Sequence, residues 1–176
     1  MTFEILPERT EDAPLIDLLL DRTFGYNRRI RTVYRLREGV APIRALCFSA
    51  IDTRGDLLGS IRYWPVVVGG RPALLLGPLA VEPVLQGQGI GRALVRASLG
   101  EARTAGHAIC IVVGAANYYR PFGFINAAQA GLIVPGPVEP ERFQVAALTP
   151  GALEDVHGLV GPDRTAVFET GQRREA

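Results

Sequence analysis

A glycine-rich segment has the residue types and spacing that suit phosphate binding. It follows an apolar strand and a proline-marked turn, precedes a helix-forming segment, and consists of Gln86, Gly87, Gln88, Gly89, Ile90 and Gly91. The start of a helix leaves about four backbone N–H groups unpartnered and carries roughly half a positive charge, so it attracts anions. Glycines lack a Cβ atom, so a phosphate can approach the backbone closely. The segment therefore predicts a diphosphate-binding loop.

Several folds bind phosphates with such loops, and the spacing separates them. The glycines recur as Gly-x-Gly-x-Gly, one residue short of the Gly-x-Gly-x-x-Gly fingerprint of dinucleotide-binding proteins. The acidic ribose ligand expected about 20 residues beyond that fingerprint has no counterpart in residues 106–112. No Gly-Lys-Ser/Thr follows, which excludes a P-loop. Taken alone, the pattern also fits a plain structural turn.

A second cluster of polar and aromatic residues lies about thirty residues further along the chain. After an apolar run it reads Asn117, Tyr118, Tyr119, Arg120, Pro121, Phe122, Gly123 and Phe124. A phenol with a pKa near 10 stays protonated at neutral pH and can donate a hydrogen bond to a developing negative charge. The cluster therefore offers a candidate proton donor.

Together the two clusters resemble the GNAT superfamily of N-acetyltransferases, and look closest to a bacterial branch of predicted acetyltransferases. Residues 86–91 are similar to the coenzyme A loop of that family, and residues 119–124 resemble the helix and turn after its fifth strand. The resemblance implies direct transfer of an acetyl group from acetyl-CoA to a primary amine of a small molecule or protein, within a ternary complex. The alternative is a non-catalytic acyl-CoA-binding module for sensing or assembly, which would not need Tyr119.

The resemblance also implies roles for single residues. Tyr119 is expected to be the general acid, although it also suits aromatic packing with Phe122 and Phe124. Asn117 is expected to contact the coenzyme, or to cap a helix. The implied coenzyme-binding set is Leu79, Ala80, Val81, Gln86, Gly87, Gln88, Gly89, Ile90, Gly91, Arg92 and Asn117, with the backbone of Leu79 and Val81 pairing with the pantetheine arm.

No general base is assigned from the sequence. Protein-lysine acetyltransferases of the superfamily commonly carry a glutamate at the position that Leu75 occupies here. Glu82 lies close to the loop but adjoins Pro83 at the end of the strand. A chain of water molecules, or an amine that arrives neutral, would serve instead.

The composition fits one domain, expected over residues 1–168 and followed by a flexible tail at residues 169–176. The 176 residues include 19 basic and 18 acidic side chains, a net charge of +1 that argues against nucleic acid as a partner. Cys47 and Cys110 are expected to be buried free thiols, so no metal site is predicted. No apolar run is long enough for a membrane span, so a cytoplasmic protein is expected. A monomer and a homodimer are both open, since exposed sheet edges could pair two copies.

The resemblance implies an α/β (α+β) GNAT fold, in which helices flank a mixed, mostly antiparallel twisted sheet of about six or seven strands. Strands are expected at residues 3–6, 44–51, 57–68, 72–81, 108–113, 130–134 and 143–148. A helical crossover makes the fourth and fifth of these strands parallel, and the resemblance implies that they splay apart.

Three helices are expected to pack around the sheet. Leu15, Leu18 and Leu19 share one face of the first, residues 27–38 form an arginine-rich second, and residues 92–106 form a third. The resemblance implies that the first two wall the acceptor side of the site. Any single arginine of the second helix is expected to face solvent.

Overall fold

The structure is a computed structural model that describes residues 2–30 and 32–166. The tail predicted at residues 169–176 lies outside these residues. The strands are β1 (Phe3–Pro7), β2 (Phe48–Asp52), β3 (Leu57–Val68), β4 (Arg71–Val81), β5 (Ile109–Val113), β6 (Ile125–Asn126), β7 (Leu132–Ile133), β8 (Phe143–Ala147) and β9 (Gly158–Pro162). The α-helices are α1 (Ala13–Phe24), α2 (Thr32–Arg35), α3 (Ile90–Thr104) and α4 (Ala116–Tyr119).

The strands form one mixed sheet in the order β1-β2-β3-β4-β5-β8-β6, with β9 pairing with the far end of β3 and with β7. Within residues 2–30 and 32–166, the parallel pairs are β4–β5 and β7–β9, and the other pairs are antiparallel. The predicted fold class, with parallel fourth and fifth strands, is confirmed. Two strands were not predicted. One is β6, which has only two residues, and the other is β9, whose Gly-Leu-Val-Gly-Pro sequence lacks the alternation of apolar and polar residues that is typical of a strand.

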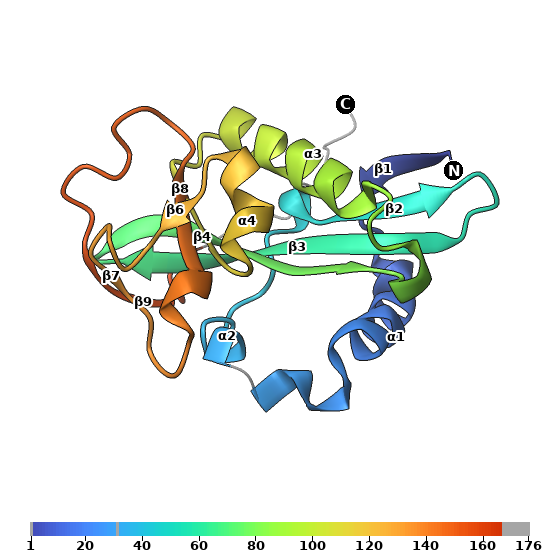
Figure 1. Cartoon of the computed structure of the whole chain (residues 1–176), viewed down its shortest axis with the longest axis horizontal. Coiled ribbons are helices and arrows are strands. Elements are labelled where there is room, and N and C mark those ends of the chain that lie inside the picture. The colour runs from blue at the N-terminus through green and yellow to red at the C-terminus, as the bar shows by residue number, and fades with distance from the viewer. Residues whose placement is uncertain (1, 31, 167–176) are drawn as a thin grey trace, which may run out of the picture.

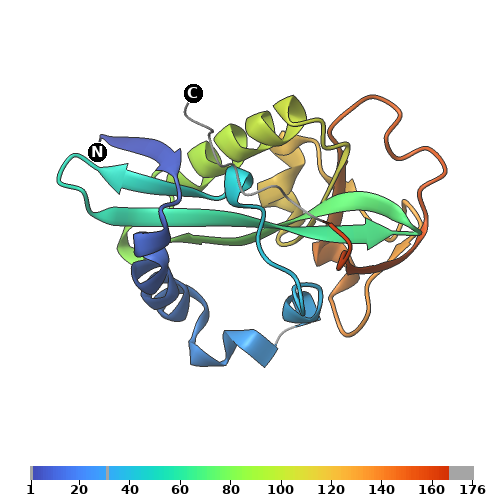
Figure 2. The same ribbon diagram turned by 180° about the vertical axis from the view of Figure 1, so that it is seen from behind.

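Helices cover both faces of the sheet (Figures 1 and 2). The long helix α3 and the short helix α4 lie over one face, and α1 and α2 lie over the other. The helix predicted from Leu15, Leu18 and Leu19 is present as α1, but its buried face was predicted wrongly. Leu15 and Leu18 are more than half exposed, while the buried side chains are Ile16, Leu19 and Leu20.

Two segments differ from their predicted secondary structure. The helix expected over residues 27–38 is instead a 3₁₀ turn, Tyr26–Ile30, and the single α-helical turn α2. The segment packs through the fully buried Leu36 as well as through the buried side chains of Arg28 and Arg37. Residues Arg44–Leu46, predicted to begin a strand, form another 3₁₀ turn, so β2 begins only at Phe48.

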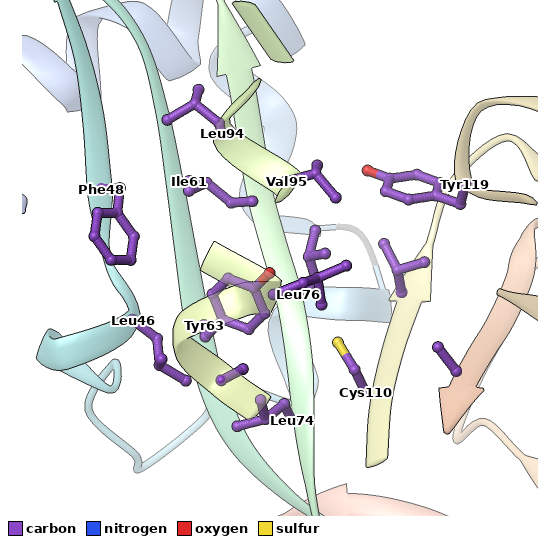
Figure 3. Close-up of a cluster of buried hydrophobic side chains, with 14 of the residues drawn as sticks. Leu46, Phe48, Ile61, Tyr63, Leu74, Leu76, Leu94, Val95, Cys110 and Tyr119 are labelled. Carbon is purple, nitrogen blue, oxygen red and sulfur yellow. The ribbon is translucent and has the colours of Figure 1, made fainter. Parts of the chain in front are cut away.

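The central strands are buried on both faces, as their continuous apolar sequences predict. Leu74, Leu76 and Cys110 point toward α3 and belong to the larger core cluster, part of which is drawn in Figure 3. Leu75 and Ile111 point to the other face and belong to a second cluster. This double burial fixes the positions of β4 and β5, the two strands that border the candidate site.

Candidate active site

A single large cavity of about 870 Å³ brings most of the predicted site residues together. It is lined by the end of β4, the loop that leads into α3, the end of β5, helix α4, and the segment that runs from α1 to Arg37. The predicted residues that line it are Leu79, Val81, Gln86, Gly87, Gly89, Ile90, Gly91, Arg92 and Tyr119.

The cavity opens where the parallel strands β4 and β5 separate. Their pairing ends at Leu76 opposite Val112, although β4 continues to Val81. On its other edge β4 stays paired with β3, where Ile61 opposes Leu79 and Tyr63 opposes Leu76. This register gives β4 one extra residue, which is a β-bulge, and bulges bend and twist the strand that contains them. The last residues of β4 therefore present an open backbone edge to the cavity.

The start of α3 forms one end of the cavity. Gly89 precedes the helix with a φ angle of 87°, and no side chain caps the helix. The first helical hydrogen bond runs from Ala93 N–H to Gly89 C=O at 3.0 Å, so the N–H groups of residues 90–92 have no acceptor within the helix. The Gln86 Nε2 amide donates to Val81 C=O at 3.4 Å and joins the loop to the strand.

The three glycines of the loop are needed for two different reasons. Gly87 and Gly89 have positive φ angles of 83° and 87°, and a Cβ atom at either would meet no atom within 4 Å. Glycine is therefore required at these two positions for its backbone conformation, and not for lack of space. A Cβ atom at Gly91 would instead lie 2.5 Å from the hydroxyl oxygen of Tyr118. Gly91 thus gives Tyr118 the room to lie against the start of α3.

Tyr119 is held tightly at the end of β5. Its ring packs against Gly114, where a Cβ atom would lie 2.2 Å from a ring carbon, and meets the ring of Phe124 edge-on at 5.5 Å. The side chain is buried, and this burial raises the pKa of the phenol well above its usual value. Figure 3 shows the hydroxyl group directed toward Val95 of α3. Tyr119 therefore packs in the aromatic cluster as a protonated phenol, and it is also one of the residues that line the cavity.

Three predicted coenzyme-binding residues do not line the cavity. Ala80 is buried on the opposite face of β4, against α1. Gln88 and Asn117 are exposed. Asn117 is also not a helix cap, because that position belongs to Ala115 and Asn117 lies within α4.

The charged residues that line the cavity are all arginines. They are Arg28, Arg37, Arg92 and Arg142. Among the residues that the structure describes, no aspartate, glutamate or histidine lines the cavity. Glu82, considered as a base, lies outside it and pairs with Arg22 of α1, with a Nε–Oε2 distance of 3.3 Å. The structure thus provides hydrogen-bond donors and positive charge, but no side-chain base, around the point where β4 and β5 separate.

Arg28 and Arg37 correct the expectation that arginines of the second helical segment face solvent. They are only 5% and 9% exposed. Arg28 donates to Asp21 at 2.8 Å, to Tyr34 Oη at 3.0 Å and to Asp17 at 3.1 Å. Burial lowers the pKa of Arg37 to about 10. The sequence signal was the unusual density of arginines, but it did not indicate which ones turn inward.

The described part of the chain contains no helix long and apolar enough to span a membrane. Within the same residues, no three His, Cys, Asp or Glu side chains are grouped as a metal site would require. The two cysteines are free and buried, as predicted.

Comparisons with known proteins agree with this geometry. The family described as the acetyltransferase (GNAT) domain matches residues 44–126. The N-acetyltransferase YhbS of Escherichia coli strain K12 is 36% identical over 151 residues, which cover 85% of this chain and 89% of YhbS. The N-acetyltransferase YjhQ of the same strain is 32% identical over 177 residues, covering 95% of this chain and 96% of YjhQ.

Solved structures give the same result. The crystal structure of YhbS from Escherichia coli in complex with CoA has a TM-score of 0.79 at 34% identity, covering 91% of this chain and 89% of that one. A GNAT family acetyltransferase from Brucella melitensis in complex with acetyl-CoA has a TM-score of 0.67 at 31% identity, covering 91% and 95% of the two chains. The chain belongs to the GNAT family of acetyltransferases.

Proposed function

We propose that this protein transfers an acetyl group from acetyl-CoA directly to a primary amine while both are bound. The observation that carries the proposal is that one cavity joins the uncapped start of α3, the open edge of β4 and the phenol of Tyr119. The CoA and acetyl-CoA complexes of the two relatives support acyl-CoA as the ligand.

The coenzyme would extend along β4 from the start of α3. Its diphosphate would accept hydrogen bonds from the N–H groups of the loop and of the first helical turn, aided by the charge of Arg92. The pantetheine arm would pair with the backbone of Leu79 and Val81 as an added strand. The side chains of these two residues belong to the face covered by α3, while Ala80 would contribute only its backbone. The thioester would then lie where β4 and β5 separate.

The reaction exchanges one bond for another at the acetyl carbonyl carbon. The amine nitrogen forms a C–N bond, the C–S bond breaks, and the electron pair leaves with sulfur. Tyr119 would donate its proton to the departing thiolate, and the proton lost by the amine would pass to water. Because burial raises the pKa of Tyr119, the phenol keeps its proton at neutral pH and is available to donate a hydrogen bond to the sulfur as negative charge develops there.

A strong side-chain base is not required for this scheme. The described lining offers no carboxylate or imidazole, so the amine would bind in its neutral form or lose its proton to water as it attacks. Holding amine and thioester at attack distance can lower a barrier by roughly 7–11 kcal/mol in favourable cases. The site would therefore act mainly by positioning and by protonating the leaving group.

The proposal is tested by measuring thiol release from acetyl-CoA with a panel of primary amines. Replacing Tyr119 by Phe should lower kcat by about 100-fold, the lower end of the effect of a general acid, without changing acetyl-CoA affinity. Tyr118→Phe is the matched control, because it removes a neighbouring phenol that lines the same cavity. Its kcat should stay close to that of the wild type.

Two results would contradict the proposal in different ways. If Tyr118→Phe lost activity and Tyr119→Phe kept it, the proton donor would be assigned to the wrong tyrosine. If acetyl-CoA bound but no amine released thiol, the protein would be an acyl-CoA-binding sensor or assembly module.

A further inference from the structure

Arg37 is a buried cation without a carboxylate partner among the described residues. Its side chain forms no ion pair there, and its Nε atom is buried without a hydrogen-bond acceptor. The guanidinium carbon lies 4.7 Å from the centre of the Tyr34 ring and 5.5 Å from that of Trp64. Aromatic rings attract a cation but accept none of its in-plane hydrogen bonds well. Even with a hydrogen bond to the Tyr34 hydroxyl group, Arg37 keeps donors available for another acceptor.

The other arginines close to Arg37 already have acidic partners. Arg28 pairs with Asp17 and Asp21, and Arg62 pairs with Glu8 through two hydrogen bonds of 2.7 and 2.8 Å. Burial is the main cause that lowers the pKa of Arg37 to about 10; Tyr34 opposes it, and the two neighbouring cations add to it. Arg37 therefore remains charged at neutral pH. An unpaired buried charge is costly, so its retention calls for a partner.

Arg37 lies beside the point where β4 and β5 separate, which is where the proposed function places the thioester. A Cβ atom at Gly77 would lie 3.4 Å from its Nη2 atom, and Gly77 directly follows the last β4–β5 pair. Tyr119 packs against Gly114 at the matching end of β5. The segment that carries Arg37 lies on the sheet face opposite α3 (Figures 1 and 2).

The phosphates of the coenzyme would lie too far away to need Arg37. Gly77 and Val81 are four residues apart, which corresponds to about 13 Å along a strand, and the phosphate-binding loop lies beyond Val81. The end of the cavity at Arg37 therefore has a positive charge for which the coenzyme provides no partner.

We propose that Arg37 binds a carboxylate of the acceptor, so that the acceptor is an amine that also carries a carboxylate, as an amino acid does. This inference rests on the proposed function. A carboxylate accepts two parallel N–H bonds from the planar guanidinium edge, a geometry that a single Lys cannot match. The charged residues that line the cavity are all arginines, which also disfavours a polyamine, because a polyamine would need acidic groups.

The experiment uses Trp64, the only tryptophan of the chain, as a fluorescent reporter beside Arg37. The CoA-loaded protein is titrated with reaction products in matched pairs, N-acetylated amino acids and their neutral amides, over several side-chain classes. Methyl phosphate is a separate arm. CoA binding is measured calorimetrically on the same samples, so failure of the proposed function is seen independently of failure of this inference.

We expect at least one carboxylate to bind about tenfold or more tightly than its amide, the ratio typical of a charged hydrogen bond. Arg37→Met keeps the apolar stem and should abolish this preference while leaving CoA affinity unchanged. Arg37→Lys, which keeps the charge but not the planar edge, should restore only part of it. Arg29→Met removes an exposed arginine of the same segment and should have no effect.

Several outcomes would overturn the inference while CoA still binds. These are equal responses to acids and amides, no saturable response to any carboxylate, a preference that survives in Arg37→Met, and a response to methyl phosphate alone. The last of these would indicate a phosphorylated acceptor instead.

Discussion

Substituting Gly91 by Ala tests the packing of Tyr118 against the start of α3. The new Cβ atom would lie 2.5 Å from the Tyr118 hydroxyl oxygen, whereas carbon atoms pack best at about 3.5–4.0 Å, so the hydroxyl group must move by about 1 Å. Tyr118 is only partly buried and can turn, so the cost should be at the low end of overpacking, about 1–2 kcal/mol. In the first turn of a helix, Ala gains about 0.5 kcal/mol over Gly.

Because of these two opposing effects, Gly91→Ala should change the free energy of unfolding in opposite directions in the wild type and in the Tyr118→Phe variant. In the wild type, Gly91→Ala should lower the free energy of unfolding by about 1 kcal/mol. In Tyr118→Phe the hydroxyl oxygen is gone, and the Cβ atom meets only Val81 Cγ2 at 3.5 Å and the ring carbon Cζ at 3.8 Å. There the same substitution should raise the free energy of unfolding by about 0.5 kcal/mol.

The assay is urea unfolding of the four proteins of this double-mutant cycle, followed by circular dichroism. The expected coupling energy between the two positions is about 1.5 kcal/mol. Equal effects of Gly91→Ala in both backgrounds, within about 0.5 kcal/mol, would refute the reasoning. Gly91 would then be required for some reason other than the room it gives Tyr118.

Three further predictions concern the thiols, the pH dependence and a buried ion pair. Burial raises the pKa of Cys47 to about 11 and that of Cys110 further, so a disulfide reagent should modify neither thiol in the folded protein and both after unfolding; fast modification of the folded protein would contradict this. The value of kcat/KM should rise with pH as the acceptor amine loses its proton. It should not fall again at high pH, because the raised pKa of Tyr119 keeps the proton donor protonated. An inflection near pH 6.5 that stays at the same pH for every amine tested would reveal a side-chain base that this account has missed. Glu8→Gln should cost about 2–4 kcal/mol of unfolding free energy, because Arg62 is only 15% exposed and would lose its charged partner, and an effect no larger than that of Glu11→Gln, whose side chain is 70% exposed, would show that the pair is not important.

The sequence was most informative where function depends on local backbone chemistry. Glycines at residues 87, 89 and 91, directly before a helix, predict an anion-binding loop because positive φ angles and missing Cβ atoms are properties of the residues themselves. The parallel pairing of β4 and β5 followed from the helical crossover between them. Neither inference required knowledge of distant contacts.

The sequence was least informative where burial depends on tertiary packing. Leu15 and Leu18 have the same periodicity as a buried helical face, yet Ile16, Leu19 and Leu20 are the side chains that reach the sheet. Arg37 looks like any surface arginine until Tyr34 and Trp64 are seen to surround it. Its burial depends on β3, more than twenty residues away, and no local pattern reports that contact.

Calorimetric titration with acetyl-CoA tests the central claim most directly. The wild type should bind acetyl-CoA, and Gly89→Glu should not, because its carboxylate would occupy and repel the diphosphate site. Gly89→Ala separates the strain of the positive φ angle, about 1–2 kcal/mol, from the effect of charge. Gly100→Glu adds the same charge at an exposed position of α3, where a Cβ atom would meet no atom within 4 Å, and should bind normally. Wild-type affinity in Gly89→Glu, or no binding by the wild type, would contradict the account.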